Sequence, residues 1–139
     1  MSVLELVSLV RLPADLRSLV VVRAAVAASL AREGWRGESA ARVILAAHEA
    51  TANAIEHGSH PSGVVEIEFS IDGDRATLRV ADDGRPGGPA LRGSSAAPAD
   101  PTGERGRGLI IMEAIAERFE LRRRDERGTE VWLEFARVP

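Results

Sequence analysis

An acidic side chain and an amide stand four residues apart inside a helical pattern in the first half of this chain. They are Glu49 and Asn53, within a run that ends at Gly58. Side chains at positions i and i+4 share one helix face, with Cβ atoms about 5–6 Å apart. A carboxylate that close to an amide oxygen suits a general base beside a metal-bound phosphate, because Mg²⁺ prefers oxygen ligands. Glu49 is therefore the candidate base and Asn53 the candidate Mg²⁺ ligand.

Asp82, Asp83 and Gly84 follow an alternating strand pattern and form a first glycine-containing segment. An Asp-Gly pair at a strand end is common in ordinary turns. In a ligand site, Gly84 would also let the backbone approach a bound group closely. Gly128 and Thr129 open the last predicted strand, and alone they indicate only a hairpin turn followed by a β-branched strand residue.

A second glycine-rich segment, residues 103–113, leads into a predicted helix. Free backbone N–H groups and the positive end of the helix dipole make the start of a helix favourable for phosphate. The candidate residues there are Arg105, Gly106, Arg107, Gly108 and Leu109. The glycines would permit a close wrap around phosphate, and one of the arginines would supply positive charge. A flexible linker is the simpler alternative.

The composition restricts the kinds of phosphate site that the chain can build. It has 139 residues, a net charge of −3, no cysteine and no lysine, so all 18 basic residues are arginines. A phosphate loop with a Gly-Lys pair and the strand lysine of eukaryotic-type protein kinases are therefore excluded. The mild negative charge argues against direct nucleic-acid binding. No apolar run is long enough for a membrane span and no signal-peptide pattern is present, so we expect a cytoplasmic protein.

The hydrophobic pattern predicts the elements that must position these residues. We expect strands over 3–12, 64–71, 76–81, 119–124 and 129–135, and helices over 13–33, 38–57 and 109–118. Residues 84–108 are dominated by Gly, Pro, Ser and Ala and are predicted to form a long lid. Helices combined with antiparallel hairpins favour the α+β class, a two-layer sandwich in one domain over residues 1–139.

The helix over 38–57 has two distinct faces. Its apolar stripe consists of Val43, Ile44, Ala47, Ala50, Thr51, Ala54 and Ile55, while Arg42, Glu49, Asn53 and Glu56 share the opposite face. The pattern therefore predicts that Glu49 and Asn53 point away from the core, toward a ligand or solvent. His57 stands at the end of this helix, where it would cap the helix or lie near a phosphate.

In their order along the chain, these segments resemble the motifs of the GHKL (Bergerat-fold) ATPases and kinases. The chain is most similar to the anti-sigma-factor serine/threonine kinases of the RsbW/SpoIIAB type, in its Asn-Ala-Ile-Glu-His-Gly run and its short lid. The resemblance implies a Bergerat fold with ATP and Mg²⁺ as cofactors. The chain departs from the family's Asp-x-Gly-x-Gly motif at Pro86, which stands at the position of the second glycine. A proline there would limit hinge motion of the lid.

The resemblance also implies roles for single residues. Glu49 would be the base, Asn53 the Mg²⁺ ligand, and Asp82 the acceptor for the exocyclic amine of adenine, with Thr129 beside it. Residues 104–109 would form the phosphate cradle. The implied partners are a sigma factor, which the protein would sequester, and a STAS-domain anti-anti-sigma factor, which it would phosphorylate. The family further implies a homodimer.

Other functions remain open at this point. An ATP-gated binding switch without phosphotransfer would not need Glu49, and a switch kinase acting on a stressosome-type scaffold would use the same site. The catalytic domain of a sensor histidine kinase would need an acceptor histidine on a separate chain.

Two further patterns do not indicate a binding site of their own. His48, His57 and His60 lack the carboxylate or cysteine partners of a zinc site. The run from Arg122 to Arg124 predicts a solvated hairpin.

Overall fold

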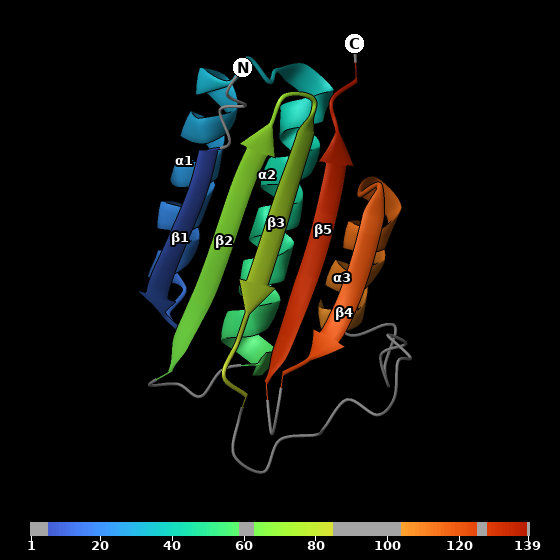
Figure 1. Cartoon of the computed structure of the whole chain (residues 1–139). Coiled ribbons are helices and arrows are strands. Elements are labelled where there is room, and N and C mark those ends of the chain that lie inside the picture. Colours follow the sequence, from blue (N-terminus) through green and yellow to red (C-terminus); the bar gives the residue numbers. More distant parts are fainter. Residues whose placement is uncertain (1–5, 59–62, 85–103, 125–127, 139) are drawn as a thin grey trace.

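The structure, a computed structural model, describes residues 6–58, 63–84, 104–124 and 128–138. They form β1 (Leu6–Pro13), α1 (Arg17–Arg32), α2 (Gly37–Asn53), a π-helical turn (Ala54–Gly58), β2 (Val64–Asp72), β3 (Arg75–Ala81), α3 (Glu104–Ile115), β4 (Arg118–Arg123) and β5 (Thr129–Ala136). Figure 1 shows the helices together on one face of a single sheet. The predicted α+β two-layer sandwich is confirmed.

The sheet is antiparallel and has five strands in the order β1-β2-β3-β5-β4. Along β2 the side chains alternate, and Val65, Ile67, Phe69 and Ile71 are buried. This alternation is what a sheet with one covered face requires. Pairing of β3 with β5 brings the end of one strand to the beginning of the other, and this pairing positions the candidate site.

Helix α2 lies between α1 and α3 and packs on the centre of the sheet (Figure 1). Its buried positions are Ser39, Val43, Ala46, Ala47, Ala50 and Thr51. The small alanines allow close packing against the central strands, where Leu78 and Leu133 are fully buried. The predicted apolar stripe is thus largely confirmed, although Ile44 is only partly buried.

Helix α3 differs most from the prediction, because it begins at Glu104 rather than at residue 109 and ends at Ile115 rather than at 118. The last part of the predicted lid, residues 104–108, is therefore helical, and the rest of that lid lies outside the described residues. Glycine disfavours a helix by about 1 kcal/mol relative to alanine. Packing of α3 against α2 offsets that cost, and a local pattern does not reveal such packing.

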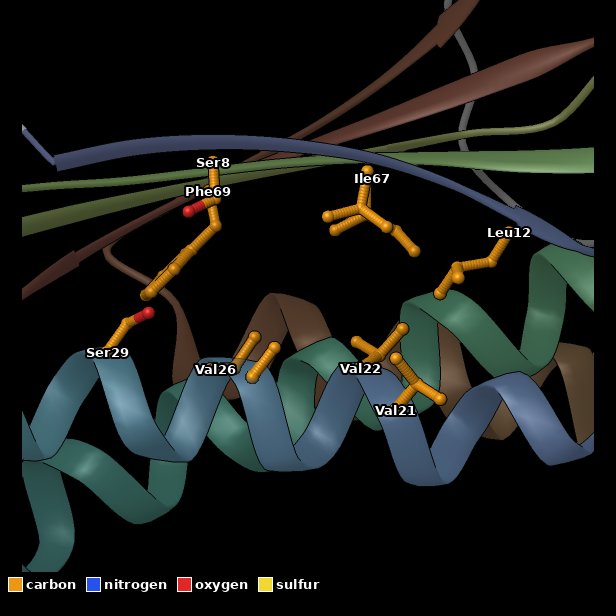
Figure 2. Close-up of a pocket in the computed structure, with 10 residues that line it drawn as sticks. Ser8, Leu12, Val21, Val22, Val26, Ser29, Ile67 and Phe69 are labelled. Atoms are coloured by element: carbon orange, nitrogen blue, oxygen red, sulfur yellow. The ribbon is translucent and has the colours of Figure 1, made fainter.

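An apolar hollow lies at one edge of the sandwich, between the edge strand β1, its neighbour β2 and helix α1 (Figure 2). It is lined by Ser8, Val10, Leu12, Val21, Val22, Ala25, Val26, Ser29, Ile67 and Phe69. None of the residues predicted to bind a ligand belongs to it. The candidate site residues lie elsewhere, around the ends of β3 and α2.

Candidate functional site

Glu49 and Asn53 lie in the last turns of α2 and face the beginning of α3. A Cβ atom built on Gly108 would lie 2.9 Å from Asn53 Nδ2 and 3.1 Å from Glu49 Oε1. Both side chains are partly buried. The pair does lie off the apolar stripe, as predicted, but its neighbour is the first part of α3 rather than open solvent. Helix α3 can approach this closely because residue 108 has no side chain.

The amide of Asn53 is the feature of this pair that points most directly to a ligand. Its Nδ2 atom is buried and has no hydrogen-bond partner among the described residues. Buried polar atoms nearly always have a partner. Rotating the amide by half a turn exchanges its nitrogen and oxygen with almost no change of shape, and the oxygen is the atom that Mg²⁺ prefers. Asn53 therefore fits a role in holding a magnesium nucleotide.

Asp82 forms the other side of the site, immediately after the end of β3. It is 4% exposed. Its Oδ1 atom accepts hydrogen bonds from the backbone N–H of Gly84 (3.0 Å) and of Thr129 (3.1 Å). Its own backbone N–H donates to the carbonyl of Thr129 at 2.9 Å. The structure thus brings together Asp82, Gly84 and Thr129, three residues predicted to bind the cofactor.

Two residues that the sequence interpretation did not assign to the site also contact Asp82. The guanidinium of Arg124 donates through Nη1 to the backbone carbonyl of Asp82 at 2.9 Å. Gly128 has φ +95°, and a Cβ built on it would lie 2.5 Å from the same carbonyl oxygen. The prediction of a solvated hairpin is therefore wrong for Arg124, which is partly buried, whereas Arg122 and Arg123 are exposed. The glycine at position 128 was the signal in the sequence for a close backbone approach, and nothing in the sequence separates Arg124 from its two neighbours.

Asn53 and Asp82 line the same small hollow, which joins the two halves of the site. Its lining is Ala50, Asn53, Ala54, Val80, Asp82, Leu109, Leu121, Thr129 and Val131. Most of these side chains are apolar, and the carboxylate of Asp82 is the acidic group among them. The hollow has a volume of about 10 Å³, room for about one water molecule, so it joins Asn53 to Asp82 without being shaped to hold a base in this structure. The adenine site at Asp82 stays a prediction.

The predicted phosphate cradle lies within α3. Gly106 and Gly108 are buried in its first turns, Leu109 lines the hollow, and Arg107 is exposed. The side chain of Arg105 is outside the described residues. The first N–H groups of a helix have no partner within it, and in α3 they precede Gly108, which lies against Asn53 and Glu49. The arrangement retains the features that favour an anion at this helix start.

The histidines contribute less to the geometry. His57 lies in the π-helical turn directly after Asn53 and is partly buried. His48 Nδ1 is buried without a hydrogen-bond partner among the described residues, as are Thr51 Oγ1 and Asp83 Oδ1. His60 falls outside the described residues. In the part of the chain that the structure describes, no group of three or more His, Cys, Asp or Glu side chains is placed to hold a metal ion.

Comparison with known proteins points to one family. The family described as "Histidine kinase-like ATPase domain" matches residues 12–135. Among solved structures, the crystal structure of the RsbU and RsbW domains of Rv1364c from Mycobacterium tuberculosis covers 95% of this chain, with a TM-score of 0.69 and 21% sequence identity. That likeness shows a shared fold, and this chain spans 32% of the other. No curated protein matches the chain. Within the described residues, no helix is both long and apolar enough to cross a membrane.

Proposed function

This chain belongs to the family of histidine kinase-like ATPase domains, and from that membership we propose that it is an ATP-dependent protein serine/threonine kinase that also serves as an anti-sigma factor. The observation that carries the proposal is the single hollow that Asn53 and Asp82 line together. It would place a base acceptor at one end and a magnesium ligand at the other. A nucleotide has the same two features, an adenine ring and a chain of phosphates.

In this proposal Asp82 accepts a hydrogen bond from the exocyclic amine of adenine, with Gly84 and Thr129 holding its carboxylate. Asn53 holds Mg²⁺, and Gly106, Gly108 and the first N–H groups of α3 approach the phosphates. Arg105 or Arg107 supplies the positive charge that lysine supplies in other phosphate sites. His57 closes the helix next to the phosphates. Bound Mg²⁺ would neutralise the charge on the transferred phosphoryl group.

Glu49 would act on the acceptor rather than on the nucleotide. Its carboxylate lies one helical turn before Asn53, and its Oε1 faces Gly108. From this position it would accept the proton of a serine or threonine hydroxyl as that hydroxyl attacks the γ-phosphate. An ATP-binding switch without phosphotransfer would not need a carboxylate at this position, and this favours the kinase.

The proposed partners are a sigma factor and a STAS-domain anti-anti-sigma factor that carries the acceptor hydroxyl. The fold shared with a crystal structure that contains an RsbW domain supports a partner-switching role of this kind. In such a role the protein would act in the cytoplasm. We also propose that it forms a homodimer, supported by the apolar side chains that α1 exposes to solvent, Val20 at 68% and Val21 at 50%.

The kinase is tested by incubating the protein with ATP, Mg²⁺ and the STAS partner and analysing the phosphorylated residue by mass spectrometry. We expect phosphoserine or phosphothreonine on the partner. Replacing Glu49 by alanine should slow transfer by about 10²–10⁴-fold, the range for loss of a general base. Glu113→Ala, which removes an exposed carboxylate from α3, is the matched control and should transfer phosphate at the wild-type rate.

The outcomes separate the alternatives. Tight ATP binding with no transfer by the wild type would favour an ATP-gated binding switch. Phosphohistidine on a partner would favour a histidine kinase. Undiminished transfer by Glu49→Ala would disprove the role of Glu49 while leaving the kinase itself in place.

A further inference from the structure

The hairpin between β4 and β5 carries a group that contacts the site from outside the predicted motifs. Arg124 lies just after the end of β4, and its Nη1 atom donates to the backbone carbonyl of Asp82 at 2.9 Å. These two residues are 42 positions apart in the sequence. The backbone N–H of Arg124 also donates to the carbonyl of Gly128 at 3.1 Å, which closes the hairpin. Arg124 therefore links the hairpin to the residue that would recognise the base.

We propose that Arg124 is a positioning residue that fixes Asp82 for adenine recognition, and so sets the preference of the site for a base with an exocyclic amine. This inference rests on the proposed function, because it presumes that Asp82 receives the base. Arg124 does not touch the nucleotide in this proposal. It acts through the backbone of Asp82.

The need for such a residue follows from the strand pairing. Asp82 lies one residue beyond the last paired residue of β3, Ala81, which is opposite Glu130. The Asp82 carbonyl is buried just past the end of the strand, and a buried carbonyl favours a hydrogen-bond donor. Arg124 supplies that donor, and a charged donor makes a stronger hydrogen bond than a neutral one.

Further contacts hold Asp82 through its Oδ1 atom and its backbone N–H. Oδ1 accepts from the N–H groups of Gly84 and Thr129, and the backbone N–H of Asp82 donates to Thr129. Gly128 permits the hairpin backbone to lie directly against the Asp82 carbonyl. Loss of the Arg124 donor would loosen the backbone of Asp82, and the carboxylate would move with that backbone. A small rotation of an acceptor weakens a hydrogen bond whose geometry is directional.

The two neighbouring arginines lack this contact. Arg122 forms an ion pair with Glu120 at 2.8 Å and lies over the ring of Trp132, 4.9 Å from its centroid. Arg123 is exposed, and no ion pair or hydrogen bond of its side chain occurs among the described residues. Arg123→Ala is therefore the matched control for Arg124→Ala. It removes the same residue type from the same hairpin, at a position opposite Thr129 where the side chain makes no hydrogen bond or ion pair among the described residues.

The test measures Kd for three Mg²⁺-bound ligands by calorimetry: ATP, inosine triphosphate, which lacks the exocyclic amine, and inorganic tripolyphosphate, which lacks the base. For Arg124→Ala we expect ATP to bind about tenfold more weakly. Tripolyphosphate should bind as in the wild type, and the ratio of ATP to inosine triphosphate affinity should fall toward one. Arg124→Lys, which keeps a charged donor, should restore part of that ratio, and Arg123→Ala should leave all three affinities unchanged.

A purely structural role for Arg124 would weaken all three ligands in proportion and lower Tm, and this result would overturn the inference. So would an unchanged ratio of ATP to inosine triphosphate affinity in a folded Arg124→Ala protein. If Arg124→Ala does not fold, the same comparison is made with Arg124→Lys and Arg124→Gln, which keep a donor in different geometry. Failure of the proposed function looks different: the wild type itself would not prefer ATP over inosine triphosphate.

Discussion

At the scale of single residues, Gly108 is the point at which α3 approaches Glu49 and Asn53 of α2. A side chain at this position would contact the far ends of Asn53 and Glu49, which are flexible, rather than any backbone atom. The fold can therefore accommodate a substitution, whereas the position of the pair cannot stay the same. This separates an effect on function from an effect on stability at one position.

Gly108→Ala is the corresponding prediction. We expect the free energy of unfolding to stay the same or to rise, because alanine favours a helix by about 1 kcal/mol over glycine. The new methyl group would displace the amide of Asn53 and the carboxylate of Glu49, so Mg²⁺-dependent ATP binding should weaken by about tenfold or more. Urea unfolding and calorimetric titration with ATP in the presence of Mg²⁺ measure the two effects.

Stability and ATP binding of the Gly108→Ala protein are compared with those of the wild type. A stable Gly108→Ala protein that binds ATP like the wild type would show that Asn53 and Glu49 do not need their present positions for binding. Loss of both stability and binding would instead indicate that residue 108 serves α3 packing alone.

At the scale of elements, the uncovered face of the sheet is held by a line of charges across β2, β3 and β5. Arg79 on β3 pairs with Glu66 on β2 at 2.7 Å and with Glu130 on β5 at 2.9 Å. Arg11 on β1 reaches Glu66 at 3.1 Å. The side chains of Arg79, Glu66 and Glu130 are only 15%, 18% and 16% exposed, so this network is better shielded than a usual surface pair.

This network predicts a pH dependence of stability. Hydrogen bonding from Arg79 lowers the pKa of Glu66 below its ordinary value, against the opposing effect of burial. A carboxyl whose pKa is lowered by folding stabilises the fold above its unfolded pKa, and this contribution is lost as the pH falls through the folded pKa. Glu66→Gln should therefore lower the free energy of unfolding by about 1 kcal/mol at neutral pH. The difference from the wild type should begin to shrink as the pH falls below about 4.3, the ordinary pKa of a glutamate, and disappear once the pH lies below the lowered pKa of Glu66 in the folded protein.

Urea unfolding of both proteins across this pH range gives the measurement. Glu113→Gln is the control, since Glu113 is an exposed carboxylate on α3, away from this network, and has no ion pair among the described residues. A difference that is independent of pH, or equally large for Glu113→Gln, would contradict the role of the Arg79–Glu66 pair.

The elements also show how far a local pattern reaches. The alternation along β2, β3 and β5 and the apolar stripe of α2 could be predicted from the sequence. Each of these elements buries one face and exposes the other, and that arrangement shows directly in the order of apolar and polar residues. The start of α3 could not be predicted, because Gly106 and Gly108 disfavour a helix locally and only packing on α2 makes it form. The prediction of a solvated hairpin was wrong for Arg124 for a similar reason. Arg124 is the third residue of an arginine run, and the sequence does not distinguish it from the exposed Arg122 and Arg123.

At the scale of the whole molecule, the two edges of the sheet differ in character. The edge strand β4 carries Arg118, Glu120 and Arg122, and charged side chains discourage pairing with another strand. The other edge, β1, is mostly apolar and is flanked by the hollow of Figure 2 and by exposed valines of α1. The edge at β1 and α1 is therefore the surface we assign to the proposed homodimer, whose two copies would meet through the same patch.

Val20→Asp tests this assignment. Val20 is 68% exposed in the single chain, so we expect the free energy of unfolding of the monomer to change little. In a dimer that buries Val20, two carboxylates would face apolar surface, and the protein should sediment as a monomer where the wild type sediments as a dimer. Analytical ultracentrifugation at several protein concentrations makes the measurement.

Leu45→Asp, at a position on α2 that is 42% exposed, is the control and should leave the oligomeric state unchanged. A wild-type protein that stays monomeric at every concentration would refute the homodimer. Dissociation by Leu45→Asp but not by Val20→Asp would move the interface away from α1.

The sequence by itself determined the fold class, the helix that carries Glu49 and Asn53, and the strand end that carries Asp82. Spacing along one helix or strand decides which side chains share a face, and this information is local. Only the tertiary structure decided that Gly108 meets Glu49 and Asn53, and that Arg124 and Gly128 hold Asp82. Those contacts join segments far apart in the chain. They depend on the order of the strands and on the packing of α3 against α2, which no single segment encodes.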